Sequence, residues 1–251
     1  MLQCERQEEI LSKLEKQKTI NISVLAKQLY VSEATVRRDI NALEKIGLVK
    51  RVYGGVMLSK YATSTDIPLT LREQERRPQK DIIASKAAEL LYDGATIFMD
   101  ASSTVQHMIP YLKSYHDLTV ITNSIKLIDN LDNTDIRVFC TGGRYISRNR
   151  AFAGPAAINM INNIFVDFFF FSSQGISMSG DISDFSEEET DLRRMMLSHS
   201  TKTYFLCDQS KIGQSFLFKV CNSTEIDGII CDIELPESIL PRQFQQQNLY
   251  R

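Results

Sequence analysis

Residues 23–47 constrain the fold of this chain more than any other stretch of the sequence. Apolar residues at helical spacing predict a short helix that ends at a tight corner, after which Ser32 offers a side-chain oxygen to cap a second helix. On the second helix Val36, Ile40 and Leu43 recur at the spacing of one buried face. Two short helices joined by a corner are typical of a helix-turn-helix.

The second helix leaves a polar and basic face for solvent, made of Thr35, Arg37, Arg38 and Asn41. Arginine can donate two hydrogen bonds to guanine or to a phosphate, threonine can contact a thymine methyl group, and asparagine can pair with adenine. A charged helix face on its own is more often ordinary solvated surface. The corner, the cap and the buried periodicity together favour a DNA-reading helix over that alternative.

A β-hairpin is predicted directly after the two helices, with strand patterns at 48–52 and 56–58 on either side of a Tyr-Gly-Gly turn. Such a hairpin is typical of the wing of a winged helix, in which Lys50 and Arg51 would contact backbone phosphates. The helix and the wing together give the side chains that we expect to contact double-stranded DNA. They are Ser32, Thr35, Arg37, Arg38, Asn41, Lys50 and Arg51.

This segment resembles the N-terminal signature of the DeoR family of bacterial transcriptional regulators, V-S-x-x-T-I/V-R-R-D-L/I-x-x-L-x-x-x-G-x-L/V-x-R-x-x-G-G. The chain follows the signature in register from Val31 to Gly55. Tyr30 is a departure, because such corners usually carry glycine and a tyrosine with positive φ would be strained. We therefore expect a corner of different geometry. The resemblance implies a DNA-binding transcriptional regulator.

The composition is that of a globular protein with two regions of opposite charge. With 251 residues, 43% of them apolar and 24% charged, the chain can form one large or two modest domains around a hydrophobic core. Residues 1–57 hold ten Lys and Arg against seven Asp and Glu, a net +3, and the remainder carries −5. A basic head on an acidic body favours a nucleic-acid reader attached to another kind of domain.

The five cysteines form no Cys-x-x-Cys pair, and the three histidines lie far from them in the sequence. We therefore expect no metal site, no disulfide framework and no cofactor. The charged N-terminus is unlike a secretory signal, and the aromatic run at 165–171 is much shorter than the about 20 residues that cross a bilayer. The expected location is the cytoplasm, without a membrane partner, and the nucleoid when an operator is bound.

From residue 79 onward, strand patterns alternate with helical patterns, which is typical of βαβ units and a largely parallel sheet. The strands are predicted at 96–99, 118–122, 136–140, 165–171, 203–207 and 228–231. The expected fold is therefore α/β, with a winged helix-turn-helix at 1–58, a linker at 59–78, and a mostly parallel α/β sheet domain at 79–251. Within the linker, residues 68–78 fit either a helix or a strand.

Polar residues follow the predicted strands at their carboxyl ends, in turns that begin at Asp100, Thr122, Thr141, Ser172 and Asp208. Ligands of open α/β sheets bind outside these ends. Hydroxyls and the N–H groups of helix starts are what a phosphate requires. One such turn alone would be read as an ordinary helix cap. Five turns that converge on one edge favour a ligand pocket.

The same turns resemble motifs of the C-terminal domain of the DeoR family, which looks like ribose-5-phosphate isomerase and senses sugar phosphates. Ser102 and Ser172 stand where two of these motifs have glycine, and Arg193 stands where a helix motif usually has lysine. The resemblance implies a domain of phosphosugar-isomerase type and a set of candidate ligand residues. These are Asp100, Ser102, Ser103, Thr104, Thr122, Asn123, Ser124, Gly142, Gly143, Gly175, Glu189 and Lys211. Two interpretations remain open for three loop arginines, Arg144, Arg148 and Arg150. One is a phosphate clamp, and the other, which is more common for such side chains, is a loop in solvent.

The leading interpretation is a repressor of a carbohydrate-utilisation operon, controlled by a sugar-phosphate effector and assembled as a dimer or tetramer because two-fold operators need paired heads. One alternative is a sugar-phosphate isomerase with a DNA-binding head, in which Asp100, Asp167, Glu188 or Glu189 would supply a base. The lysine that such isomerases carry before the glutamate helix is missing, so no catalytic residue is expected. A second alternative is an interaction domain with a vestigial pocket.

Overall fold

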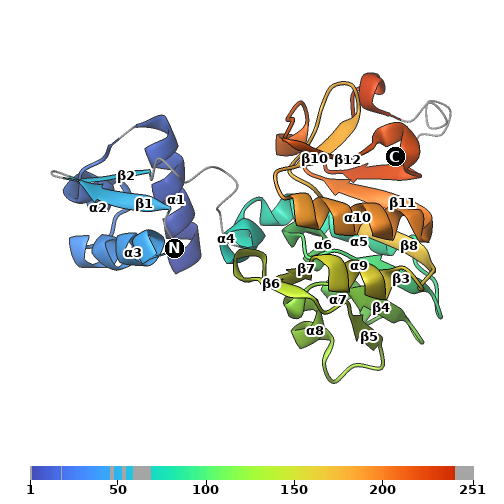
Figure 1. Ribbon diagram of the computed structural model, residues 1–251. Helices are drawn as coiled ribbons and strands as arrows, with labels where there is room; N and C mark the ends of the chain where they lie inside the picture. Colours follow the sequence, from blue (N-terminus) through green and yellow to red (C-terminus); the bar gives the residue numbers. More distant parts are fainter. Residues whose placement is uncertain (1, 18, 46–47, 53–54, 59–68, 241–251) are drawn as a thin grey trace. The chain divides into compact units, whose positions relative to one another are not determined.

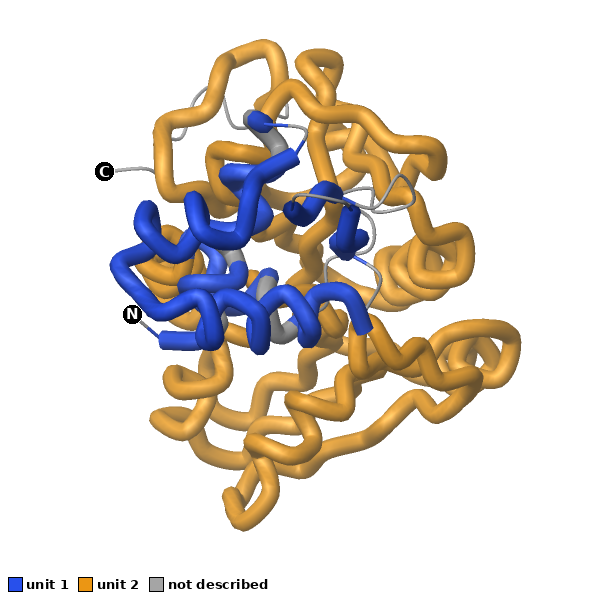
Figure 2. The backbone as a smooth tube through the Cα atoms, turned by 90° about the vertical axis from the view of Figure 1, so that its left-hand side faces the viewer, with its two compact units in different colours: residues 1–76 blue, residues 77–251 orange. Residues whose placement is uncertain are grey.

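The computed structural model describes residues 2–17, 19–45, 48–52, 55–58 and 69–240 and separates into two compact units, Met1–Arg76 and Arg77–Arg251 (Figures 1 and 2). Of the interval expected to be a linker, residues 59–68 lie outside the described residues. The remainder contains helix α4, Leu69–Gln74, and the first residues of helix α5, Arg77–Ala88. The sequence left helix and strand open for residues 68–78, and the described part of this interval is helical rather than a strand.

The first unit is a winged helix-turn-helix, as predicted. Its first three helices are α1, Gln3–Lys16, α2, Ile22–Gln28, and α3, Glu33–Lys45, and its wing pairs β1, Val49–Val52, with β2, Gly55–Leu58. The wing is antiparallel, and Ile20 extends it by a single bridge to Val56. Ile10, Leu25 and Ile40 meet with the buried side of the wing in one core, which fixes the orientation of α3.

The corner between α2 and α3 keeps the backbone shape that a glycine would have there. Tyr30 has a φ of 55°, in the left-handed region, and its side chain is 94% exposed. The following amide, Val31 N–H, donates to the carbonyl of Ala26 at 3.1 Å, which closes the helix end as such corners usually do. The expectation of a different corner geometry is wrong, because Tyr30 adopts the left-handed backbone despite its Cβ, and its exposed side chain needs no space in the core.

The second unit is built on a six-stranded parallel sheet in the order β13-β11-β8-β3-β4-β5. Every neighbouring pair of strands in it is parallel, which confirms the predicted α/β class. The strands are β3, Thr96–Met99, β4, Thr119–Thr122, β5, Arg137–Cys140, β8, Val166–Phe171, β11, Ser200–Cys207, and β13, Gly228–Cys231. Each corresponds to one of the strands expected from the sequence.

Helices cover both faces of this sheet (Figure 1), and its central strands bury apolar side chains on both sides, as Phe170 of β8 does on one face and Phe171 on the other. One face packs on α5, α6, Ser103–Gln106, α7, Ile109–Leu112, and α8, Ile125–Leu131. The other packs on α9, Pro155–Ile161, and α10, Glu187–Ser198. Among the described residues, none of the helices combines the length and the apolar character needed to span a membrane.

Two smaller sheets were not predicted. An antiparallel sheet in the order β12-β10-β9 combines Phe218–Asn222, Asp181–Asp184 and Gly175–Ile176. A hairpin pairs β6, Arg144–Ile146, with β7, Ala151–Ala153. The described residues of this unit also form four short 3-10 turns: η2, Ser147–Asn149, η3, Gln209–Lys211, η4, Ser223–Glu225, and η5, Glu237–Ile239. The antiparallel sheet and η3 border the carboxyl ends of the parallel strands.

Candidate functional site

The predicted DNA-contacting side chains of α3 lie on its solvent side. Arg37, Arg38 and Asn41 are exposed, whereas Val36 and Ile40 on the opposite side are fully buried. The predicted cap also forms. Ser32 Oγ accepts the Thr35 N–H at 3.2 Å and lies 2.9 Å from the Thr35 hydroxyl, so the cap fixes a second polar side chain at the start of α3.

The wing brings one of its basic residues, Arg51, against α3. The Arg51 guanidinium contacts Asn41 Oδ1 and lies 3.3 Å from Glu44 Oε2, which connects β1 to α3. Arg37 Nη2 lies 3.2 Å from Glu33 Oε2, in an exposed pair along the helix. By contrast, the side chains of Arg38 and Lys50 make no ion pair or hydrogen bond to any described residue. The face therefore offers both free and weakly held cations.

A buried ion pair that the sequence did not reveal holds α3 against α1. Arg6 Nε lies 2.5 Å from Asp39 Oδ2, and Arg6 Nη2 donates to Asp39 Oδ1 at 3.2 Å. Asp39 is only 1% exposed. One sequence signal was available, because Asp39 follows Val36 by three residues and therefore falls on the buried side of the predicted helix.

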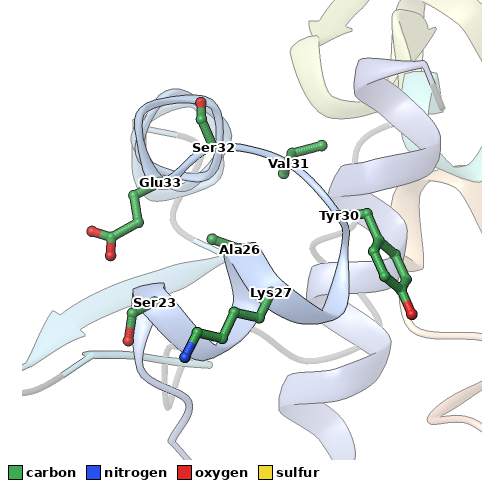
Figure 3. A pocket seen from close by; sticks show the side chains of 7 residues that line it. All are labelled: Ser23, Ala26, Lys27, Tyr30, Val31, Ser32 and Glu33. Carbon is green, nitrogen blue, oxygen red and sulfur yellow. The ribbon is translucent and has the colours of Figure 1, made fainter.

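A shallow hollow of about 490 Å³ lies beside the corner of the helix-turn-helix, and it is wide open to solvent (Figure 3). It lies between Ser23 and Lys27 of α2 on one side and Ser32 and Glu33 at the start of α3 on the other. Tyr30 projects away from these side chains (Figure 3). Mixed charge and an open shape give this hollow no feature of a small-molecule site.

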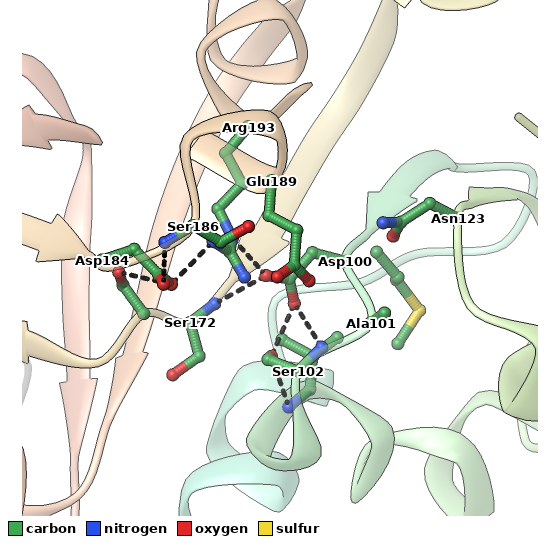
Figure 4. Close-up of polar contacts among 12 residues, drawn as sticks. Asp100, Ala101, Ser102, Asn123, Ser172, Asp184, Ser186, Glu189 and Arg193 are labelled. Atoms are coloured by element: carbon green, nitrogen blue, oxygen red, sulfur yellow. Dashed lines mark hydrogen bonds and ion pairs between the residues drawn. The ribbon is translucent and has the colours of Figure 1, made fainter. Parts of the chain in front are cut away.

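In the second unit, a buried arginine joins the end of β3 to the small antiparallel sheet (Figure 4). Arg193 Nε donates to Asp100 Oδ2 at 2.8 Å, and its Nη1 donates to Asp184 Oδ2 at 2.9 Å. Burial lowers the pKa of Arg193, but the charges of Asp100, Asp184 and Glu189 outweigh burial and raise that pKa above its ordinary value. The guanidinium therefore stays charged in a site where it is 7% exposed.

Asp100 is fully engaged by protein groups. Its Oδ1 accepts the Ser102 N–H at 3.1 Å and the Ser102 hydroxyl at 2.5 Å. Its Oδ2 accepts the Ser172 N–H at 3.4 Å in addition to Arg193 (Figure 4). The two serines that stand at the expected glycine positions thus contact Asp100 directly, Ser102 through its backbone and its side chain and Ser172 through its backbone.

The other carboxylates required by the isomerase alternative are also occupied or distant. Both oxygens of Glu189 accept hydrogen bonds from Asn149 Nδ2, at 2.8 and 2.7 Å, and Glu188 pairs with Arg144. Asp167 lies at the amino end of β8, on the opposite edge of the sheet, where it accepts the Thr96 N–H at 2.7 Å. Asp100, Asp167 and Glu189 are thus each held by hydrogen bonds from protein groups, whereas Glu188 is held only by an exposed ion pair.

Lysines gather where β11 ends. Lys211 Nζ donates to Ser172 Oγ at 2.6 Å, and that hydroxyl in turn donates to the Leu206 carbonyl at 2.6 Å. Burial raises the pKa of Asp208, but the charge of Lys211, hydrogen bonds from Ser210 and the charge of Lys80 outweigh burial and lower that pKa below its ordinary value. Lys80 was not predicted, although it lies one turn before the buried Ile83 on the inner side of α5.

Several predicted ligand hydroxyls serve the backbone instead. Ser102 Oγ accepts the Val105 N–H at 3.4 Å and Ser124 Oγ accepts the Leu127 N–H at 3.3 Å, so the capping interpretation holds for both. Thr122 Oγ1 donates to the Met99 carbonyl at 2.7 Å. Ser103 is buried beside them at the start of α6.

Three buried oxygens near these turns have no hydrogen-bond partner among the described residues. They are Thr104 Oγ1, Gln106 Oε1 and Asn123 Oδ1. The amide nitrogens of the last two are engaged, since Gln106 Nε2 donates to the Ala101 carbonyl at 3.0 Å and Asn123 Nδ2 to the Phe152 carbonyl at 2.9 Å. Unsatisfied buried oxygens are uncommon in folded proteins. Gln106 was not among the residues expected from the sequence.

The predicted glycines and loop arginines have structural roles. A Cβ on Gly143 would lie 2.7 Å from the Ala153 carbonyl, and one on Gly175 would lie 2.6 Å from Gln214 Cβ, whereas Gly142 stands at an open turn with a φ of 62°. Among the arginines, Arg150 Nη2 lies 3.1 Å from Asp129 Oδ2 and Arg148 lies 4.9 Å above the Phe185 ring. Nothing in these contacts favours a phosphate clamp.

Comparison with known families agrees with both halves of this description. The profile described as "DeoR-like helix-turn-helix domain" matches residues 6–61, and the profile described as "DeoR C terminal sensor domain" matches residues 75–233. The chain belongs to the DeoR family. This DeoR-family protein is accordingly a transcriptional regulator with an N-terminal DNA-binding domain and a C-terminal sensor domain, and not an isomerase.

Relatives of this DeoR-family regulator match over nearly their whole length. The L-fucose operon activator of Haemophilus influenzae is 33% identical and covers 93% of this chain and 94% of its own. The glycerol-3-phosphate regulon repressor of Escherichia coli is 27% identical, with 96% and 95% covered. A solved structure, the translation initiation factor eIF-2B of Pyrococcus horikoshii OT3, has a TM-score of 0.52 at 14% identity, covers 97% and 92%, and shares the fold alone.

Proposed function

We propose that this regulator represses a carbohydrate-utilisation operon by docking α3 and its wing on double-stranded operator DNA, and that a sugar phosphate bound in the sensor domain changes that docking. The observation that carries the proposal is the exposed basic face of α3, on which Arg38 has no partner among the described residues. The helix and the wing hairpin are the two elements that such domains present to DNA.

The contacts within this face support its use for DNA. The Arg37–Glu33 pair is exposed on both sides, and such pairs contribute about 0–1 kcal/mol, so a phosphate or a base can replace the glutamate. Arg51 is held by Asn41 and Glu44, which keeps it over α3. We assign base contacts to Thr35, Arg37, Arg38 and Asn41, and backbone contacts to Ser32, Lys50 and Arg51.

Fluorescence anisotropy on the promoter beside its own gene tests the DNA contacts. Replacing Arg38 by alanine is expected to weaken operator binding by about 1–3 kcal/mol, roughly 5- to 150-fold, because one good bidentate base contact is lost. Arg194→Ala, which removes the same charge from the exposed side of α10, is the matched control and should bind as wild type. Wild-type affinity in Arg37→Ala and Arg38→Ala alike would contradict the proposal.

The sensor pocket is assigned to the carboxyl ends of β3, β4, β8 and β11. Lys211 supplies a cation there, and the unsatisfied oxygens of Thr104 and Asn123 supply polar groups without partners among the described residues. The names of the two relatives, a glycerol-3-phosphate regulon repressor and an L-fucose operon activator, support a phosphorylated carbohydrate as effector. The first of these names supports the repressor role.

Thermal denaturation with a panel of phosphosugars tests the effector. A ligand that binds only the folded state at 100 times its Kd stabilises that state by about 2.7 kcal/mol, so the correct compound must raise the melting temperature. Lys211→Met is expected to abolish the shift. Absence of any shift across the panel would favour a vestigial pocket instead.

Two-fold operators need two reading heads, so we propose a homodimer or homotetramer that acts in the cytoplasm, on the nucleoid. Light scattering of the purified full chain, free and mixed with an operator duplex, measures the stoichiometry. A single chain per operator would contradict this part of the proposal and leave the DNA contacts standing.

A further inference from the structure

We propose that Gln106 is a specificity-determining residue of the sensor pocket. Its amide oxygen and the amide oxygen of Asn123 accept hydrogen bonds from hydroxyl groups of the effector. These two oxygens lie on one side of Asp100, and the Lys211 ammonium lies on the other. This inference rests on the proposed function of the sensor domain. It narrows the effector to a phosphomonoester that carries several free hydroxyl groups.

The amide orientations follow from their fixed partners. Gln106 Nε2 lies 3.0 Å from the Ala101 carbonyl and Asn123 Nδ2 lies 2.9 Å from the Phe152 carbonyl. A carbonyl oxygen only accepts, so the amide nitrogen must face it in each case. The group left without a partner among the described residues is therefore the oxygen of each amide. Both side chains are 4% exposed, so bulk solvent does not satisfy these oxygens.

The chemistry of the missing partner follows from this. An amide oxygen accepts hydrogen bonds and cannot donate them, and an ionised phosphate also only accepts. A phosphate group therefore cannot satisfy Gln106 Oε1 or Asn123 Oδ1, whereas a sugar hydroxyl can donate to either. The unsatisfied Thr104 hydroxyl, which can both donate and accept, belongs to the same set.

The topology separates the two ends of such a ligand. Ser172 follows β8, Asp100 follows β3 and Asn123 follows β4, which are neighbours in that order in the sheet. Adjacent strands lie about 4.8 Å apart, so the backbones that carry Ser172 and Asn123 are roughly 10 Å apart. Figure 4 shows Asn123 on one side of Asp100 and Ser172 on the other. Because Lys211 donates to Ser172 Oγ, its charge lies at the Ser172 end.

Gln106 connects the turns after β3 and β4. It stands at the end of α6, and its amide nitrogen lies within 3.4 Å of the Ser124 hydroxyl as well as the Ala101 carbonyl. The side chain thus holds both hydroxyl-rich turns in register while its oxygen remains without a partner among the described residues. The proposal accordingly puts the phosphate near Lys211 and the hydroxyls near Gln106.

A ligand series on the wild-type full chain tests this without any variant. Isothermal titration would compare inorganic phosphate, ethyl phosphate, glycerol 3-phosphate, ribose 5-phosphate, 2-deoxyribose 5-phosphate, glucose 6-phosphate and fructose 6-phosphate. We expect the best phosphosugar to bind at least 100-fold more tightly than inorganic phosphate or ethyl phosphate. Equal binding of ethyl phosphate and the best sugar would overturn the inference and leave the proposed effector class intact. If no compound bound, the proposed function itself would fail.

A matched pair of variants then tests Gln106. Gln106→Met keeps the length of the side chain and removes the amide, so it should weaken the best phosphosugar at least tenfold and leave inorganic phosphate unchanged. Gln28→Met, at an exposed glutamine of α2 in the other unit, should bind every one of these ligands as wild type. If Gln106→Met bound every ligand as wild type, the partner of that oxygen would be a buried water. If affinity fell equally for inorganic phosphate and for the sugars, the variant would have a general defect. Either result would overturn the inference.

Discussion

Arg193 illustrates how much of this site depends on single buried charges. Its guanidinium bridges Asp100 and Asp184, and each of the three side chains is less than a tenth exposed. A charge in such a place is stable only while its partners are present, because removing one partner leaves the other buried and unpaired. The residue therefore holds the end of β3 to the small antiparallel sheet.

Replacing Arg193 by alanine is expected to lower the free energy of unfolding by about 3–5 kcal/mol, since two buried carboxylates lose their counter-charge. Urea denaturation followed by circular dichroism measures the change. Arg194→Ala is the matched control, because the neighbouring arginine makes a half-exposed pair with Asp191 that contributes about 0–1 kcal/mol. A similar loss of unfolding free energy in the two variants would show that the buried bridge contributes no more to stability than the exposed pair.

Tyr30 is strained at the corner of the helix-turn-helix. Replacing it by glycine is expected to raise the free energy of unfolding of the first unit by about 0.5–1 kcal/mol, because relief of a left-handed backbone exceeds the added entropy of the unfolded chain. Tyr30→Ala keeps the Cβ that causes the strain and should give no gain. Chemical denaturation would measure both, and an equal gain for alanine would refute the account.

At the scale of elements, the orientation of α3 depends on α1. The Arg6–Asp39 pair is buried and doubly hydrogen-bonded, so it holds the recognition helix at a fixed rotation with its basic side in solvent. The operator-reading side chains contribute nothing to this pair, and Asp39 itself cannot reach DNA because it is 1% exposed.

Asp39→Ala is therefore expected to lower the free energy of unfolding of the first unit by about 3 kcal/mol and to weaken operator binding, although it removes no predicted DNA contact. Glu33→Ala, which breaks the exposed Arg37 pair, should cost less than about 1 kcal/mol. Denaturation and anisotropy on the same preparations separate the two effects. Full operator affinity in Asp39→Ala would show that the pair does not orient α3.

The strands of the parallel sheet could be predicted because each is a short apolar run between turn residues. The small sheet could not, since β9 has two residues and β10, Asp181–Asp184, has one apolar side chain among four. The polar turns of the candidate site were likewise visible in the sequence. Their partners were not, because Arg193 meets Asp100 from 93 residues away, and no local pattern encodes such a contact.

At the scale of the whole molecule, the two units have separate hydrophobic cores, and the basic head and acidic body fall in different units. The effector and the operator are proposed to bind different units. Any coupling between them must be reciprocal, because an effector that weakens operator binding is itself bound more weakly when the operator is present.

Calorimetry of the full chain is expected to resolve two unfolding transitions, one for each unit. A saturating phosphosugar should raise the temperature of the sensor transition, and an operator duplex should raise that of the head, since each ligand stabilises the fold that binds it. A single transition that both ligands shift equally would contradict separate folding of the units.

Both carboxylate oxygens of Asp100 accept hydrogen bonds from Ser102, Ser172 and Arg193, and this has a consequence for a ligand bound beside them. A carboxylate whose oxygens are all accepting hydrogen bonds has no free lone pair with which to draw a proton from a bound sugar. Asp100 would therefore not act as a base on a molecule bound in the pocket. The fraction of sensor domains with bound ligand would then follow the ligand concentration at equilibrium, and binding would not consume the ligand. After a change in that concentration, the bound fraction would adjust within about one residence time of the ligand.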